Sequence, residues 1–185
     1  MKQYTIVGGA HGVGKSSLLG ALSAVRTDLG IIIDTDKITA ECGGKTAEER
    51  INECLQQGVS FTQETTLSGA LTVNTIKAAQ ESGYKIRLCY ISIESAEECI
   101  SRIVKRVCKG GHSVSSEEVQ RSFSERFDVL ASVLPLCDEA VFFDNENGFV
   151  AAAEYKNGEF IMRSESNPCW IVRLGDYFSH QNGDT

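Results

Sequence analysis

The fold is decided by the stretch Gly9-Ala10-His11-Gly12-Val13-Gly14-Lys15-Ser16, which fits the pattern G-x-x-x-x-G-K-[ST]. Glycines allow the backbone to curl so that successive N–H groups face phosphate oxygens, and the helix that follows adds the positive end of its dipole. We expect Lys15 to bind the β- and γ-phosphates and the Ser16 hydroxyl to ligate Mg²⁺. Together with the adjacent Ser17, the stretch predicts a binding site for ATP or GTP with Mg²⁺.

Short β-rich runs alternate with longer helical stretches along most of the chain. The pattern predicts strands at residues 3–7, 30–33, 59–63, 85–93 and 139–143. It predicts helices at residues 16–25, 46–57, 69–81, 96–108 and 116–134. We therefore expect an α/β protein with the P-loop NTPase fold, in which a mainly parallel sheet of five strands carries helices on both faces.

The C-terminal part follows a different pattern. Two β-like runs within residues 148–163 flank Lys156-Asn157-Gly158, and Asn-Gly is a strong hairpin signal. Residues 169–174 are expected to add a strand, and residues 175–185 to form a poorly ordered end. The predicted organisation is a kinase-like domain at residues 1–147, a β-hairpin extension of that domain at residues 148–174, and a tail at residues 175–185.

Charge and cysteine content limit the choice of partner and compartment. The 185 residues carry a net charge of −7, and phosphate backbones and anionic lipids attract basic surfaces, so we expect no nucleic-acid or membrane partner. The seven cysteines include no CxxC pair, and we interpret them as buried apolar residues in a reducing compartment. No apolar run is long enough for a signal peptide or a membrane span, so we expect a cytoplasmic protein.

Two carboxylates, Asp34 and Asp36, follow the second predicted strand. Ligands of open α/β sheets bind at the carboxyl ends of the strands. We expect Asp36 to act as the general base that accepts the proton of a substrate hydroxyl, and Asp34 to assist beside it as a metal or structural helper. The alternative is that either residue only caps the next helix.

The segment Glu64-Thr65-Thr66-Leu67-Ser68 leads from the third predicted strand into a helix. Glu64 would lie at the same edge of the sheet, where a carboxylate can accept hydrogen bonds from hydroxyl groups of a sugar or metabolite. Thr66 and Ser68 could contact the substrate or, as an equal alternative, cap the helix. Farther along, Asp144 and Asn145 are expected to end the last strand near the nucleotide base.

A cationic stripe marks one face of the helix predicted at residues 96–108 and its end: Arg102, Lys105, Arg106 and Lys109. Gly110 and Gly111 follow, and glycines permit a mobile lid that closes over phosphates. An arginine from such a lid would stabilise the charge on a transferring phosphoryl group. The alternative is a solvated helix face. Arg121 is a candidate second cation, whereas Arg126 is interpreted as a surface residue.

These motifs together resemble the zeta-toxin-like P-loop kinases, in particular the compact bacterial branch sometimes labelled as predicted ABC-type ATPases. The motifs that carry the resemblance are Gly9–Ser16, the Asp34 and Asp36 pair, Phe61–Ser68 and the segment Arg106-Val107-Cys108-Lys109-Gly110-Gly111-His112-Ser113-Val114. The resemblance implies that Asp36 is the general base, that Glu64 and Thr66 contact the substrate, and that Arg106 acts at the transferring phosphate. Arg102, His112 and Arg121 compete for the role of the second cation.

The resemblance implies phosphoryl transfer from ATP or GTP to a hydroxyl of a small acceptor, such as UDP-N-acetylglucosamine, and an antitoxin as a protein partner. Two other hypotheses stay open. The chain could be a metabolite kinase similar to shikimate or gluconate kinases, which also use Asp-x-Asp after the second strand. It could instead be a nucleotide-dependent binding protein that acts through a partner.

Overall fold

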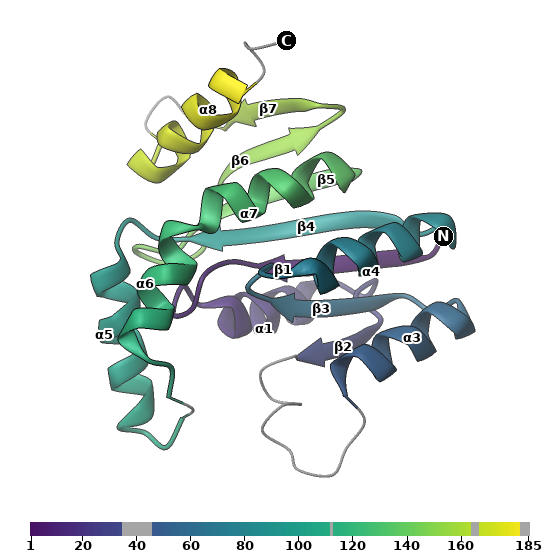
Figure 1. Cartoon of the computed structure of the whole chain (residues 1–185), viewed down its shortest axis with the longest axis horizontal. Helices are drawn as coiled ribbons and strands as arrows, with labels where there is room; N and C mark the ends of the chain where they lie inside the picture. The colour runs from purple at the N-terminus through teal and green to yellow at the C-terminus, as the bar shows by residue number, and fades with distance from the viewer. Residues whose placement is uncertain (35–45, 112, 164–166, 182–185) are drawn as a thin grey trace.

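Seven strands form one sheet in the order β2-β3-β1-β4-β5-β6-β7 (Figure 1). The computed structural model describes residues 1–34, 46–111, 113–163 and 167–181. The strands are β1 (Gln3–Gly8), β2 (Ile31–Asp34), β3 (Phe61–Thr65), β4 (Lys85–Ser92), β5 (Glu139–Asp144), β6 (Val150–Lys156) and β7 (Glu159–Met162). The five strands from β2 to β5 in this order are parallel, as the sequence predicts, and β6 and β7 join as an antiparallel hairpin.

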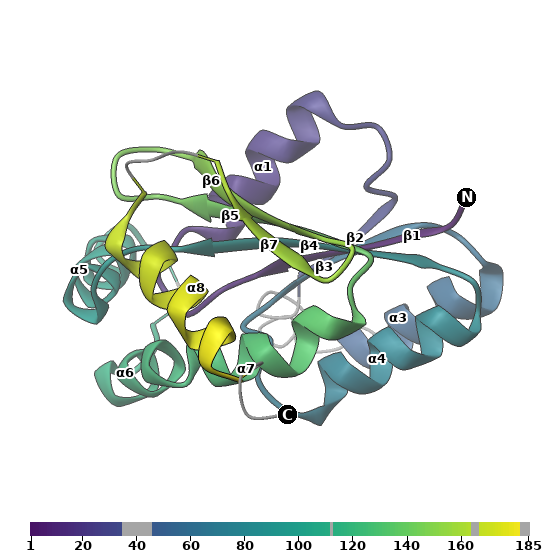
Figure 2. The same ribbon diagram turned by 90° about the horizontal axis from the view of Figure 1, so that it is seen from above.

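Helices cover both faces of the sheet, as expected (Figure 2). The helices are α1 (Lys15–Val25), α3 (Ala47–Gln57), α4 (Ala70–Glu81), α5 (Ala96–Val107), α6 (Ser116–Ser124), α7 (Arg126–Val133), the short 3-10 helix η1 (Leu134–Leu136) and α8 (Cys169–Gln181). Helix α1 lies on one face, whereas α3, α4, α7 and α8 lie on the other. Helices α5 and α6 lie at the end of the sheet where the parallel strands finish.

Local sequence explains where α3 begins and how the chain turns between β6 and β7. The side chain of Thr46 accepts a hydrogen bond from Glu49 N–H, and the Glu49 carboxylate accepts one from Thr46 N–H, so a capping box starts α3. Between β6 and β7, Asn157 and Gly158 have φ values of 54° and 85°. Positive φ at both central residues is what a two-residue hairpin turn requires, which confirms the predicted hairpin.

The single helix predicted at residues 116–134 is wrong, because the chain changes direction at Glu125, which ends α6 and begins α7. The two helices bury side chains in different clusters. Val119 packs with α1 and α5 residues near the glycine-rich loop, whereas Leu130 and Val133 pack into the main core beneath the sheet. One straight helix could not direct both apolar faces into these two clusters.

The strand expected at residues 169–174 is also wrong, because Cys169–Gln181 forms α8. The poorly ordered end expected at residues 175–185 is wrong as far as residue 181, and residues 182–185 lie outside the described residues. Trp170, Ile171 and Leu174 are all fully buried. Their spacing places them on one side of a helix, where they pack against the sheet. Burial of this apolar face outweighs the strand propensity of the β-branched and aromatic residues.

The cysteine interpretation holds in part. Cys54, Cys89, Cys99 and Cys137 are buried free thiols, but Cys108 and Cys169 are exposed. Within the described ranges, no helix is long and apolar enough to cross a membrane.

Candidate active site

The glycine-rich loop between β1 and α1 adopts a conformation that its sequence makes possible. Gly12 has φ of 82°, and a Cβ there would lie 2.6 Å from the carbonyl oxygen of Cys99. Gly14 has φ of 105°, and a Cβ there would lie 2.5 Å from the side-chain nitrogen of Asn145. Residues that carry a Cβ rarely adopt such φ values, and their side chains would collide at both positions. Both positions therefore require glycine.

The first turn of α1 supplies the polar groups of the loop. Lys15 is buried at 6% exposure, and its Nζ donates a hydrogen bond to the carbonyl oxygen of Ala10 across the loop, at 3.1 Å. The ammonium is thereby held at the amino-terminal end of α1, where the helix dipole also favours an anion.

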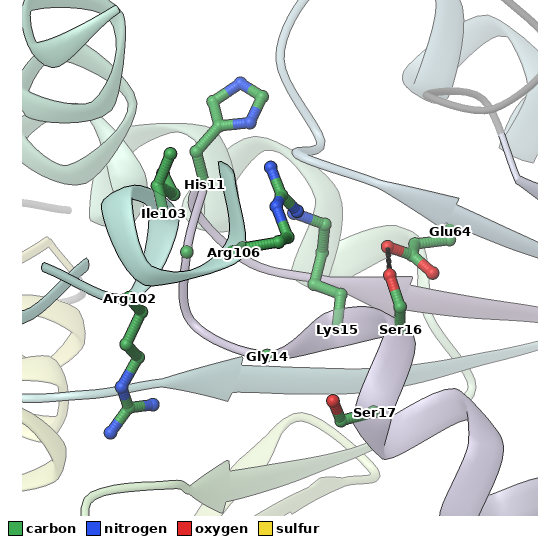
Figure 3. Close-up of a pocket in the computed structure, with 10 residues that line it drawn as sticks. His11, Gly14, Lys15, Ser16, Ser17, Glu64, Arg102, Ile103 and Arg106 are labelled. Carbon is green, nitrogen blue, oxygen red and sulfur yellow. Dashed lines mark hydrogen bonds between the residues drawn. The ribbon is translucent and has the colours of Figure 1, made fainter. Parts of the chain in front are cut away.

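A cavity of about 250 Å³ opens beside this turn (Figure 3). Its lining residues come from the loop, the start of α1, the end of β3 and one side of α5: His11, Gly12, Gly14, Lys15, Ser16, Ser17, Glu64, Arg102, Ile103 and Arg106. Lys15 and Arg106 bring positive charge to the same cavity from two different elements. The glycine-rich loop, the amino terminus of α1 and the two cations Lys15 and Arg106 together suit a polyphosphate.

Glu64 meets the loop directly. The Ser16 hydroxyl donates a hydrogen bond to Glu64 Oε1 at 2.7 Å, although the two residues are 48 positions apart in the chain. A serine hydroxyl has one donor and two acceptor lone pairs, so donation to Glu64 leaves its lone pairs for a cation. Hydroxyl and carboxylate oxygens are ligands that Mg²⁺ accepts, directly or through water. The residues present therefore fit the Mg²⁺ that the loop motif implies.

The sheet also brings Asp34 to this edge. Asp34 pairs in register with Glu64 on the neighbouring strand, so the two side chains leave the sheet on the same face. In the described part of the chain, no cluster of three or more His, Cys, Asp and Glu side chains is placed to hold a metal ion.

Arg102 and Arg106 lie on α5 and both line the cavity, but their contacts differ. Arg102 Nε donates to Glu98 Oε1 at 3.0 Å, and its Nη2 donates to the carbonyl oxygen of Asn145 at 2.9 Å. In Figure 3 the guanidinium of Arg102 points away from Lys15. Arg106 is exposed and points over the loop on the side of Lys15.

The glycines after α5 have a local explanation. Gly110 N–H donates to the carbonyl oxygen of Val107 and Gly111 N–H to that of Arg106, at 2.9 and 3.0 Å. With Gly110 at φ of 85°, this is a Schellman motif, which ends a helix. A Cβ on Gly111 would lie 2.6 Å from the side chain of Arg106, so this glycine also leaves room for that arginine. That the segment moves as a lid stays a prediction.

Several other predicted site residues are not brought to the cavity. Arg121 is exposed on α6 and is not among the lining residues. Thr66 lies after β3, where its hydroxyl is 2.7 Å from that of Ser68. Neither hydroxyl caps α4, because the capping residue is Gly69 and no side chain bonds to this helix start, so the capping alternative is wrong.

Asp36 and His112 lie outside the described residues.

The structure adds residues that sequence reasoning did not connect to the loop. The loop residue His11 donates its backbone N–H to Ser122 Oγ at 3.3 Å, and its Nε2 lies 3.6 Å from Glu118 Oε1, so α6 supports the tip of the loop. Asn145 follows β5, and its side chain donates to the carbonyl oxygen of Val13 at 2.8 Å. No local motif could have found these contacts, because the pairs lie more than a hundred positions apart in the sequence.

Two further groups, Cys99 and Arg126, are structural. Burial raises the pKa of the Cys99 thiol to about 12, so Cys99 stays neutral behind the loop and is no nucleophile. Arg126 was expected at the surface, but its guanidinium carbon lies 3.8 Å from the ring centre of Phe123 and 4.3 Å from that of Phe127. This half-buried cation packs between two aromatic rings, and burial lowers its pKa.

Solved structures share this architecture. A chain of the AvrRxo1-ORF1:ORF2 complex, solved with ATP, superposes with a TM-score of 0.59 at 20% identity, over 96% of this chain and 63% of that one. This chain therefore spans less than two thirds of the AvrRxo1 chain. A chain of the PezAT chromosomal toxin-antitoxin system of Streptococcus pneumoniae superposes with a TM-score of 0.61 at 14% identity, over 100% of this chain and 88% of that one. At these identities the likeness shows the fold alone.

Sequence comparison gives a nearer relationship. No protein-family model matches the chain. An uncharacterised protein of Haemophilus influenzae is 31% identical over 123 residues, which cover 60% of this chain and 86% of that protein. The chain therefore belongs to the same family as this Haemophilus influenzae protein, and it has the P-loop NTPase fold that it shares with the PezAT chain.

Proposed function

We propose that this protein is a kinase that transfers the γ-phosphoryl group of ATP or GTP to a hydroxyl of a small acceptor. One observation carries the proposal: a single cavity collects the buried Lys15, the Ser16–Glu64 hydrogen bond and the exposed Arg106 of a separate helix. Lysine and the loop N–H groups would bind the phosphates, while an arginine from outside the loop can follow the charge of the transferring group.

In this proposal Ser16 and Glu64 would together hold Mg²⁺, which would supply positive charge to neutralise the phosphates when bound. This gives Glu64 a metal-side role in place of the substrate contact that the family resemblance implies. The support is its 2.7 Å contact with the Ser16 hydroxyl. Asp34, beside Glu64 in the sheet, would lie between this metal site and the acceptor.

The acceptor we propose is a nucleotide sugar of the UDP-N-acetylglucosamine type, with Asp36 as the general base. In the sequence Asp36 comes two residues after Asp34, which ends β2 and pairs in register with Glu64. A carboxylate there would take the proton of the attacking hydroxyl. We also propose a protein partner, because PezAT is a toxin-antitoxin system and the AvrRxo1 chain was solved in a complex.

The test is incubation of the protein with ATP, Mg²⁺ and a panel of sugar nucleotides and small polyols, followed by mass spectrometry of the acceptors. We expect one acceptor to gain a phosphoryl group. Lys15→Ala should abolish nucleotide binding and turnover, whereas Asp36→Ala should remove turnover while nucleotide still binds.

Each outcome points to one hypothesis. A phosphorylated small polyol in place of a sugar nucleotide would favour a metabolite kinase. Hydrolysis of ATP with no phosphorylated acceptor would favour a nucleotide-dependent binding protein. Full turnover by the Asp36→Ala variant would exclude Asp36 as the base.

A further inference from the structure

Asn145, just after β5, is hydrogen-bonded both to the end of β4 and to the glycine-rich loop. Its backbone N–H donates to the carbonyl oxygen of Ser92 at 3.1 Å, which ties it to the end of β4. Its side-chain Nδ2 donates to the carbonyl oxygen of Val13 at 2.8 Å, in partly buried surroundings. The same Nδ2 lies only 2.5 Å from the position that a Cβ on Gly14 would take. The amide therefore packs directly against the loop backbone.

The orientation of one peptide group follows from this contact. In a trans peptide the carbonyl and the N–H of the same unit point in opposite directions. The Val13 carbonyl points to the Asn145 side chain, so the N–H of Gly14 points away from that side chain. Gly14 itself lines the cavity beside Lys15 and Ser16.

We infer that Asn145 is a positioning residue for phosphate binding, an inference that rests on the proposed function. It holds the Val13–Gly14 peptide in the orientation that directs an N–H, and not a carbonyl oxygen, at the polyphosphate. A loop with Gly12 and Gly14 at positive φ on either side of Val13 is otherwise free to turn this peptide over, and the exposed carbonyl would then repel the anion.

Two further contacts hold Asn145 in place. The guanidinium of Arg102 on α5 donates to its backbone carbonyl at 2.9 Å. Its neighbour Asp144 accepts a hydrogen bond from the indole N–H of the buried Trp170 on α8, at 2.8 Å. Arg102 therefore positions the loop through Asn145, and its location does not require it to contact the transferring phosphate.

This role differs from the contact with the nucleotide base that the sequence suggests for Asn145, and ligand binding can separate the two. A residue that acts through Gly14 affects any polyphosphate, whereas a residue that contacts the base affects only ligands that contain one. We therefore propose calorimetric titration with Mg-ATP and with Mg-tripolyphosphate, which has no base or ribose.

The variants are Asn145→Leu, which keeps the size and neutral charge but removes the donor, and Asn145→Ala as a smaller change. We expect both to weaken Mg-ATP and Mg-tripolyphosphate by the same factor, about five- to tenfold, because a donor is lost and a carbonyl is left unpaired. The matched control is Asn74→Ala, at an exposed position on α4, which should bind both ligands as the wild type does. Melting temperatures without ligand establish that each variant is folded; if one is not, the other is used for the same comparison.

The contrary outcomes are distinct. Unchanged tripolyphosphate affinity in a folded Asn145 variant overturns the inference, whether or not ATP binding falls. If ATP alone is weakened, Asn145 contacts the base instead. Failure of the wild-type protein to bind either ligand would overturn the proposed function, and this inference with it.

Discussion

Arg102 and Arg106 lie on consecutive turns of the same helix, but their surroundings differ, and we expect different roles for them. Arg102 is fixed by the Glu98 carboxylate and the Asn145 carbonyl, so its charge is already used in holding the site together. Arg106 is exposed at the cavity, where it can approach a ligand. The sequence pattern places both cations on one helix face but cannot show which of them bonds to Asn145.

The two arginines should therefore differ in kinetics. Arg106→Ala should lower kcat by roughly 10²–10³, because one positioned group that stabilises the transition state is lost. Lys105→Ala is the matched control, since Lys105 is an exposed cation of the same helix and is not among the residues that line the cavity beside Lys15. Steady-state kinetics with the acceptor identified by the panel measures both. If both variants lost the same rate, the loss would come from the reduced positive charge of α5 and not from a specific role of Arg106.

The best-predicted site residues are those of a contiguous motif. Lys15 and Ser16 lie where the glycine-rich pattern requires, because that pattern encodes its own backbone geometry. Glu64 was correctly placed at the binding edge from strand order, but its contact with Ser16 depends on β3 being the neighbour of β1. The pairing of β3 with β1 depends on the whole sheet and cannot be predicted from the local sequence of β3 alone.

At the scale of elements, α8 is the clearest disagreement between sequence pattern and structure. Its sequence contains Trp170, Ile171 and Val172 in a row, which favours a strand. In the structure this segment covers the sheet near β4 and β5, and the Trp170 indole packs against Tyr90 at 6.2 Å between ring centres. Packing against that surface selects the helix, since only helical spacing directs Trp170 and Leu174 to the same side.

Removal of the Trp170 side chain should destabilise the whole protein. Trp170→Ala deletes a fully buried indole and the N–H that bonds to Asp144, and should lower the free energy of unfolding by about 3–5 kcal/mol. Val172→Ala on the exposed side of α8 is the control and should change it by less than about 0.5 kcal/mol. Urea denaturation measures both. If the two substitutions cost the same, α8 is not packed on the sheet as described.

At the scale of the whole molecule, an ion-pair network ties the segment after α1 to the middle of the sheet. Asp28 accepts hydrogen bonds from Arg26 at 2.8 Å and from Arg87 on β4 at 2.9 Å, and Arg87 also donates to Glu139 on β5 at 2.6 Å. The hydrogen bond from Arg26, followed by that from Arg87, holds the pKa of Asp28 well below its usual range, against the opposing effect of partial burial.

This shift predicts a pH-dependent contribution to stability. Because the pKa of Asp28 is lower in the folded than in the unfolded protein, its stabilising effect is present above roughly pH 4 and is lost as the pH falls toward the folded-state value. Asp28→Asn should therefore be less stable than the wild type at pH 7, with a difference that shrinks below roughly pH 4. Urea denaturation at a series of pH values measures it, with Glu81→Gln at an exposed position of α4 as control. A difference that stays constant over this pH range would show that the charge of Asp28 is not responsible.

By itself, the sequence determined the fold class, the parallel core of the sheet, the hairpin and the phosphate loop, because each of these depends on local periodicity, turn residues or one contiguous motif. Only the tertiary structure decided that residues 169–181 form a helix, that the chain bends at Glu125, and that Asn145 holds the loop. The reason is physical: these features follow from burial and hydrogen bonding between segments distant in the chain, and such contacts exist only once the strands have taken their order in the sheet.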